Sequence, residues 1–196
     1  MNLKINDKII QFKIIPLLFN ERNIESVFYK KNNKTLKQTF EHPKYSRLKL
    51  LLIDKYNAQL DKNLGDFLKL LKQGNDSNYL CFLNKYGDSR YCNFKIDTHL
   101  KDKGIYCYIK DDKIKYVGRC TDNFEKRINQ GYGKIHPKNC FIDGQATNCH
   151  LNSIINSADN VKFGVYIMND KQTHEIIELE KQILTCNRFE WNIKTS

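Results

Sequence analysis

The sequence of 196 residues predicts an α+β protein, because short apolar strands and amphipathic helices follow one another in mixed order. Apolar runs at 104–110 and 113–119 are joined by a polar turn, which predicts an antiparallel hairpin. Apolar side chains recur every three or four positions over 172–186, which predicts a long amphipathic helix. An apolar content of 40% supports a packed core.

The first half of the chain is predicted to be rich in helix. Leucines and tyrosines recur at helical spacing from Tyr45 to Leu60 and again from Leu64 to Leu71. We interpret both stripes as core. The other segments are predicted to be one or two strands at 3–18, a basic loop or arm at 29–38, and a hairpin of 79–83 with 90–96.

The second half continues from the hairpin at 104–119 with alternating signals. The patterns predict a helix at 123–130, a glycine-containing loop at 131–146, a short helix at 147–156 and a third strand at 161–168. A polar segment at 97–103 separates this series from the first half. We therefore predict an N-terminal region at 1–97 and a second domain at 98–196.

Positive charge is concentrated in the first half. Residues 1–103 contain 20 Lys and Arg against 11 Asp and Glu, whereas residues 104–196 contain 13 against 11. The formal net charge of +11 suggests a polyanionic partner such as nucleic acid. A merely lysine-rich, solvated surface would give the same excess.

The seven cysteines include no CxxC pair, so a disulfide framework is not expected. Cys140, Cys149 and His150 do not have the spacing of a common structural zinc site. The N-terminus lacks the apolar core of a signal peptide, and no apolar run is long enough to span a bilayer. These features predict a soluble cytoplasmic protein without a membrane partner.

Glu180 is singled out by the pattern of the long helix. It projects near the middle of the apolar face, whereas Glu178 projects toward solvent. A carboxylate in that place is costly unless it is paired, protonated or bound to metal. A buried salt bridge and a metal ligand both remain open. The apolar face consists of Ile176, Ile177, Leu179, Ile183 and Leu184.

Two tripeptides stand at corresponding places in the predicted hairpin: Gly104-Ile105-Tyr106 and, ten residues later, Tyr116-Val117-Gly118. Tyrosines so placed on adjacent antiparallel strands would face one small patch of surface. Arg127 follows on the next predicted helix, and Asn192 follows Glu180 by twelve residues. In this series the chain resembles the GIY-YIG nuclease family, over about its last 95 residues.

The resemblance implies a central three-stranded antiparallel sheet flanked by helices. It also implies a catalytic set of Tyr106, Tyr116, Arg127, Glu180 and Asn192. Tyr106 would act as general base toward water or as direct nucleophile, and Arg127 would hold the scissile phosphate. Glu180 would be the metal ligand, and Asn192 a supporting polar group.

A free phenol has a pKa near 10, so Tyr106 needs a nearby cation to act as a base at neutral pH. Lys115, Arg119 or the metal could supply that charge. A single carboxylate suggests one Mg²⁺ or Mn²⁺ ion per site, held mostly by water and phosphate oxygens. No nucleotide cofactor is expected.

Several further residues are candidates by chemistry alone. Tyr132 and His150 could complete the site, although a glycine-rich loop followed by a capped helix explains the same segment. The basic stretch offers DNA contacts, although it could equally be a solvated connector. Its candidate DNA-binding residues are Lys30, Lys31, Lys34 and Lys37.

These observations together predict a divalent-metal-dependent DNA endonuclease, most similar to type II restriction enzymes of the family. Region 1–97 would bind duplex DNA and set specificity, and cutting both strands with one site per chain predicts a homodimer, at least on DNA. Alternatives are a structure-selective or homing-type nuclease and a non-catalytic nucleic-acid-binding protein with a decayed nuclease fold. A third is an RNA-binding protein in which Glu180 is structural.

Overall fold

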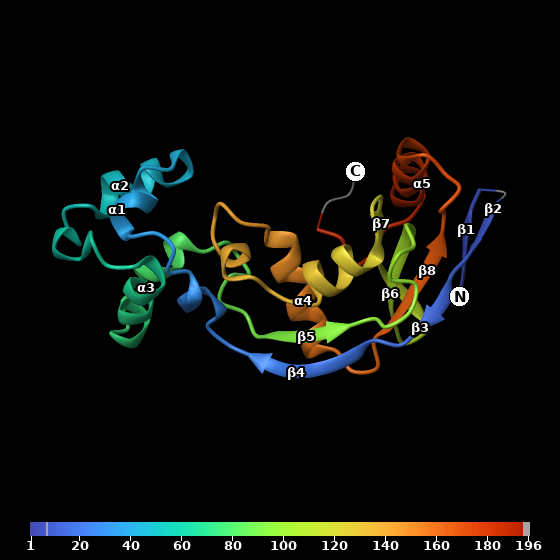
Figure 1. Ribbon diagram of the computed structural model, residues 1–196, viewed down its shortest axis with the longest axis horizontal. Coiled ribbons are helices and arrows are strands. Elements are labelled where there is room, and N and C mark those ends of the chain that lie inside the picture. The colour runs from blue at the N-terminus through green and yellow to red at the C-terminus, as the bar shows by residue number, and fades with distance from the viewer. Residues whose placement is uncertain (7, 194–196) are drawn as a thin grey trace. The chain divides into compact units, whose positions relative to one another are not determined.

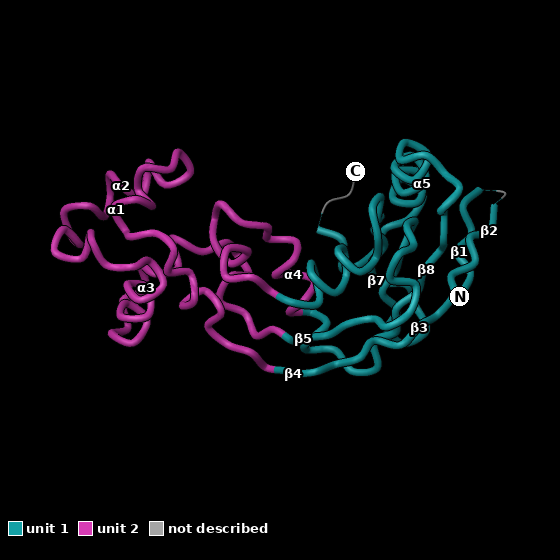
Figure 2. The backbone as a smooth tube through the Cα atoms, in the orientation of Figure 1, with its two compact units in different colours: residues 1–22, 92–134, 154–196 teal, residues 23–91, 135–153 magenta. Residues whose placement is uncertain are grey.

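The computed structural model describes residues 1–6 and 8–193 (Figure 1). The chain forms two compact units, and each is discontinuous in sequence (Figure 2). The first unit comprises 1–22, 92–134 and 154–196, and the second comprises 23–91 and 135–153. Their extents differ from the regions 1–97 and 98–196, whose proposed division of function stays a prediction.

The first unit contains a four-stranded antiparallel sheet, which confirms the mixed α+β class. The strand order is β3 (Lys13–Ile15), β8 (Lys162–Ile167), β6 (Gly104–Lys110) and β7 (Lys113–Cys120). Strands β6, β7 and β8 lie where the sequence predicted them. Strand β3 adds an edge from the N-terminal segment, beyond the three strands that the second half supplies.

The hairpin of β6 and β7 has two local irregularities. Asp111 and Asp112 both adopt positive φ angles, 50° and 52°, as the two central residues of a tight hairpin turn require. The pairing then shifts, because Tyr108 faces Tyr116 whereas Ile109 faces Ile114. Lys115 is therefore the additional residue of a β-bulge on β7.

The two faces of this hairpin are covered by different helices. One face packs its aliphatic side chains, including Ile105 and Val117, with Ile176 and Ile183 of α5 (Thr173–Cys186). The predicted helix at 172–186 is thus confirmed, although Ile177 of its expected apolar face is 39% exposed. The opposite face of the hairpin carries the tyrosines.

Two further helices correspond to predicted ones. The segment predicted as a helix at 123–130 forms η5 (Glu125–Tyr132), which is a π-helix. At its end, the backbone amide of Gly133 donates to the Ile128 carbonyl at 2.6 Å. Phe124 and Ile128 are fully buried, as their spacing predicted. The short helix expected at 147–156 is α4 (Ala146–Ser157).

The remaining strands form two small sheets. Strand β1 (Asn2–Ile5) pairs with β2 (Lys8–Gln11), and β4 (Leu18–Ile24) pairs with β5 (Tyr91–Lys95). The predicted hairpin of 79–83 with 90–96 is wrong. Residues 77–82 form the 3₁₀-helix η4 (Ser77–Phe82), because the Asp76 carboxylate accepts the Asn78 amide at 3.0 Å and starts a helical turn.

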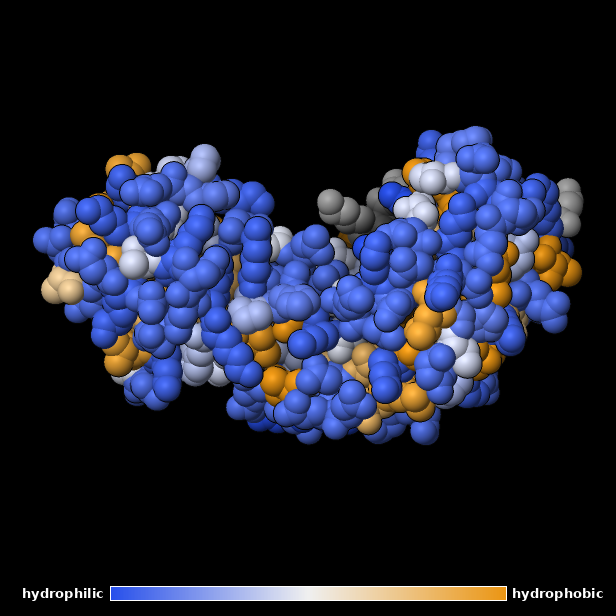
Figure 3. Space-filling model, viewed as in Figure 1, coloured by the Kyte–Doolittle hydropathy of each residue, from blue (hydrophilic) through white to orange (hydrophobic). Residues whose placement is uncertain are grey.

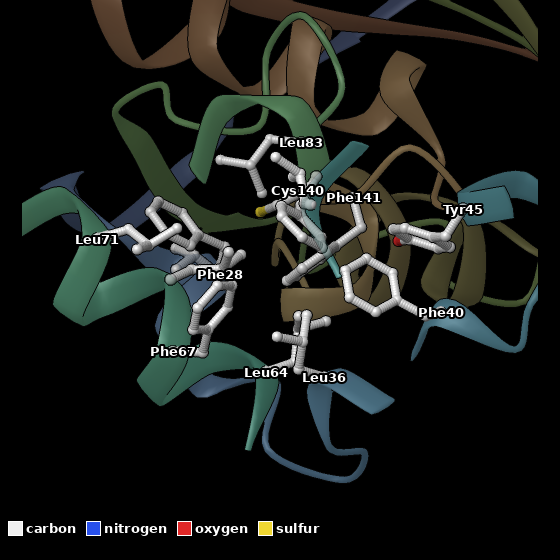
Figure 4. Close-up of a cluster of buried hydrophobic side chains, with 14 of the residues drawn as sticks. Phe28, Leu36, Phe40, Tyr45, Leu64, Phe67, Leu71, Leu83, Cys140 and Phe141 are labelled. Carbon is white, nitrogen blue, oxygen red and sulfur yellow. The ribbon is translucent and has the colours of Figure 1, made fainter. Parts of the chain in front are cut away.

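The second unit is built from short helices around an aromatic and leucine core (Figure 4). The prediction of a basic loop at 29–38 is wrong at both ends. A 3₁₀-helix includes Tyr29 and Lys30, and Thr35 caps a helix through a reciprocal capping box, with Leu36 fully buried. The helices of this unit are η1 (Val27–Lys30), α1 (Leu36–Phe40), η2 (Pro43–Tyr45), α2 (Ser46–Leu52), η3 (Asn57–Gln59), α3 (Leu64–Gln73), η4, η6 (Pro137–Cys140) and the first eight residues of α4, 146–153.

The surface is mainly hydrophilic on the face seen in Figure 3, with small apolar patches in each unit. No helix within residues 1–6 and 8–193 combines the length and apolar character needed to cross a bilayer. None of the seven cysteines, all of which lie in the described residues, forms a disulfide.

Candidate active site

A cluster of four buried tyrosines lies on one face of the hairpin. Tyr106 and Tyr108 come from β6, Tyr116 from β7 and Tyr132 from the end of η5. The ring centres of Tyr106 and Tyr116 are 6.1 Å apart, and the hydroxyls of Tyr116 and Tyr132 are 3.1 Å apart. The two predicted tyrosines therefore lie together, with Tyr132 beside them. They are buried and do not form the patch of surface that the sequence predicted.

The glycines of the two tripeptides are needed for this arrangement. Gly104 has a φ of +145°, and a Cβ there would lie 2.1 Å from the Tyr166 carbonyl oxygen. A Cβ at Gly118 would lie 2.6 Å from the Tyr106 hydroxyl, because Gly118 is directly opposite Tyr106 in the ladder. The side chain of Tyr106 occupies the space that any other residue at position 118 would fill.

Arg127 connects the tyrosine cluster to the protein surface. Its Nε donates to the Tyr106 hydroxyl at 3.2 Å, and its guanidinium carbon lies 5.0 Å from the centre of the Tyr132 ring. The helix that carries Arg127 is held by Asn129, whose amide group bonds to both the amide and the carbonyl of Ile96 at 2.8 and 2.9 Å. The backbone of Arg127 is thus held in place, and its side chain is exposed to solvent.

The pKa of the Tyr106 phenol is raised well above its usual range, first by complete burial and then by the neighbouring tyrosines Tyr116 and Tyr132. The charge of Arg127 offsets part of this rise. The pKa of Arg127 is itself raised, chiefly by Tyr106. At neutral pH, Tyr106 is a neutral phenol beside a permanent cation.

A polar cleft of about 470 Å³ opens beside Arg127. It lies where the end of β7, the following loop, the start of η5 and one side chain of α5 meet. Three of its side chains are cationic and two are anionic. The lining residues are Arg119, Cys120, Thr121, Asp122, Asn123, Lys126, Arg127 and Glu180.

Glu180 enters this cleft from α5 and is paired with Arg119. Its side chain is only 13% exposed, and the guanidinium of Arg119, which is 44% exposed, donates to its carboxylate. The sequence predicted a carboxylate that needs a partner, and the structure identifies that partner as Arg119.

The cleft has two carboxylates, and each is paired with a cation: Glu180 with Arg119, and Asp122 with Lys126. Glu180 presents carboxylate oxygens to an open polar space, where water and phosphate oxygens could complete the coordination. No group of three or more His, Cys, Asp or Glu side chains with metal-binding geometry occurs in the described part of the chain. A cation bound to the Glu180 carboxylate would have to displace Arg119.

Asn192 and Lys115 do not line the cleft. The Asn192 side chain accepts from the amide of Val117 at 3.0 Å and donates to its carbonyl at 2.9 Å, so it extends the edge of β7 as a strand would. Lys115, on the bulge, pairs with Glu190 at 2.6 Å. Both contacts fasten the C-terminal segment to β7.

The other predicted residues belong to the second unit. His150 packs on Tyr86 with ring centres 4.5 Å apart. Lys31 is buried and lies 3.5 Å from Asp143. Lys30, Lys34 and Lys37 belong to the same unit.

Tyr108 is a residue of the cluster that sequence reasoning missed. Its position two residues after Tyr106 on a strand places both side chains on one face, which is the signal that could have found it. Its hydroxyl is fully buried and has no hydrogen-bond partner among the described residues. Such a group adds to the cost of burying polar atoms in the cluster.

Replacing Gly118 with alanine should displace the Tyr106 ring. We expect a loss of about 1–3 kcal/mol in the free energy of unfolding, the usual cost of overpacking a core, measured by urea denaturation. Gly131→Ala is the matched control, because a Cβ there would meet only the Lys126 carbonyl oxygen of the same helix, at 3.3 Å. Equal losses of stability in the two variants would show that the space beside Gly118 is not specifically occupied by the Tyr106 side chain.

The chain was compared with protein-family models, with curated proteins and with solved structures, and no match was found in any of the three comparisons.

Proposed function

We propose that this protein is a divalent-metal-dependent endonuclease that hydrolyses phosphodiester bonds of duplex DNA, with a site of the GIY-YIG kind. The observation that carries the proposal is the cleft in which Glu180, Arg119 and Arg127 meet, with Tyr106 directly behind Arg127. A carboxylate for a cation and guanidinium groups for a phosphate are the parts that phosphodiester hydrolysis needs.

Arg127 is assigned to the scissile phosphate. Its Nε is engaged by Tyr106, which leaves the terminal nitrogens of the guanidinium for phosphate oxygens. Arg119 is a second donor once its carboxylate partner is taken by a cation. A divalent cation held by Glu180 would neutralise charge on the phosphate and on the leaving 3′ oxygen.

Tyr106 is assigned to the activation of the attacking group, as general base or as nucleophile. Both roles require the phenolate, and Arg127 is the cation that favours it. Lys115 and Arg119, the cations considered from sequence, are instead paired with Glu190 and Glu180. Tyr116 and Tyr132 support the ring of Tyr106 and share a hydrogen bond with each other.

Within this class we propose a type II restriction endonuclease of the cytoplasm, with Mg²⁺ or Mn²⁺ as cofactor. One site per chain favours a homodimer on DNA, since two strands must be cut. The second unit, with its short helices and exposed lysines, is assigned to DNA binding and specificity.

Plasmid and phage DNA incubated with the protein, with Mg²⁺ or with EDTA, tests the proposal. Glu180→Ala should abolish cleavage without changing the circular dichroism spectrum or DNA binding. Glu178→Ala, the same substitution at an exposed position of the same helix, should cut normally.

Discrete fragments that require both metal and Glu180 would support a restriction enzyme. Cleavage confined to branched substrates would favour a structure-selective enzyme instead. DNA binding without any metal-dependent cleavage would favour a non-catalytic binding protein. Unfolding of the Glu180→Ala variant would show that Glu180 has a structural role.

Arg127→Ala should lower the single-turnover cleavage rate by more than about a hundredfold, as the loss of one charge-stabilising donor does in other enzymes. Arg127→Lys should not restore the rate, because an ammonium cannot replace the planar fork of donors. Arg188→Ala, at an exposed position of the same unit, serves as the control. Near-normal turnover of the Arg127 variants would exclude this residue from the site.

The cleavage rate should rise with pH. Because the pKa of Tyr106 is raised, only a small fraction is phenolate at neutral pH, and that fraction grows about tenfold per pH unit. We expect the logarithm of the single-turnover rate to increase with a slope near one between about pH 6.5 and 9. A plateau that begins below pH 8 would show that a group of lower pKa controls the reaction.

A further inference from the structure

A small pocket with several charged lining residues lies entirely within the second unit. Its volume is about 70 Å³. Three lysines and one aspartate contribute its charged groups, an excess of two positive charges. The lining residues are Lys31, Asn33, Lys34, Thr39, His42, Tyr45, Lys138 and Asp143.

Lys31 is the unusual member of this pocket, because it is a charged side chain with only 9% exposure. Its Nζ lies 3.5 Å from the Asp143 carboxylate and 4.1 Å from the centre of the Phe141 ring. The same Asp143 oxygen accepts the Tyr45 hydroxyl at 2.7 Å. One carboxylate, already shared with a tyrosine, is therefore the anionic partner available within the pocket.

The lysines of the pocket repel one another. Burial lowers the pKa of Lys31, Asp143 offsets part of this effect, and the charges of Lys138 and Lys34 lower it further. An anion bound among the three lysines would relieve this repulsion. The free protein thus carries a concentration of positive charge that its own side chains only partly compensate.

Neutral groups add hydrogen-bond donors. The Nδ1 of His42 accepts the Lys44 amide at 3.2 Å, which leaves the proton of a neutral imidazole on Nε2. Asn33 adds an exposed side-chain amide. Phosphate oxygens only accept hydrogen bonds, so a pocket rich in donors suits them.

We propose that this pocket binds one phosphate group, and that the group belongs to the backbone of DNA. The assignment of the source rests on the proposed nuclease function, whereas the chemistry of the pocket does not. Such a contact would hold the second unit at a fixed place on the duplex without reading sequence.

Lys34 and Lys138 are the residues to replace, since both are exposed and their loss leaves the pair of Lys31 with Asp143 intact. The matched control is the double variant Lys49→Ala/Lys69→Ala. It removes the same charge from exposed helix positions of the same unit, outside the pocket. Thermal denaturation should show that both double variants fold.

Binding of the full chain to a 30-base-pair duplex is measured by fluorescence anisotropy in EDTA, from about 50 to 300 mM KCl. Lys34→Ala/Lys138→Ala should weaken binding for any duplex sequence. It should also reduce the slope of log K against log salt by about one, the contribution of one phosphate. The control pair should change the slope by clearly less.

The ³¹P NMR signal of inorganic phosphate distinguishes the two possible sources. Broadening that the pocket variant abolishes, with DNA binding unchanged, would keep the phosphate site but assign it to a small phosphorylated ligand. Equal effects of the two double variants on DNA, or no effect on either probe, would overturn the proposal. Because the binding assay contains no metal, failure of cleavage would not affect its outcome.

Discussion

The hydrogen bond from Arg127 to the Tyr106 hydroxyl is the contact on which the candidate site depends. It requires a glycine opposite Tyr106, since a Cβ at Gly118 would collide with that hydroxyl. It requires η5 to be anchored, which Phe124, Ile128 and the paired amide of Asn129 achieve. The wide turns of a π-helix, which are often found at functional sites, carry Arg127 at this point.

Local sequence was sufficient to predict most elements of the second half, although η6 lies in the segment 131–146 that was predicted to be a loop. Strands β6, β7 and β8 are short apolar runs, and α5 has a period of 3.6 residues, so their positions follow from local sequence. The edge strand β3 could not be predicted as their neighbour, because nothing near residues 13–15 encodes a pairing with residues 163–165. The incorrect hairpin at 79–83 failed for a local reason, since a single capping aspartate outweighed an apolar run.

Some features of the site residues could likewise be predicted from local sequence, whereas others could not. Glu180 was predicted to be buried and in need of a partner, because one charge on an apolar helix face is visible in sequence. The identity of that partner and the pairing of Lys115 with Glu190 depend on how β7 approaches the helix and the C-terminal segment. The structural role of Asn192 could not be predicted either. In sequence, an asparagine that bonds to a strand edge looks the same as one that binds a ligand.

The edge strand β3 has a consequence for any shortened form of the protein. A fragment that starts at residue 98 would retain the tyrosines, Arg127 and Glu180 but would lose the partner of β8. The backbone groups of residues 163–165 would then be unpaired at an open sheet edge, a template for adding strands from other molecules. Such a fragment would be expected to self-associate, even though it contains all the residues of the cleft.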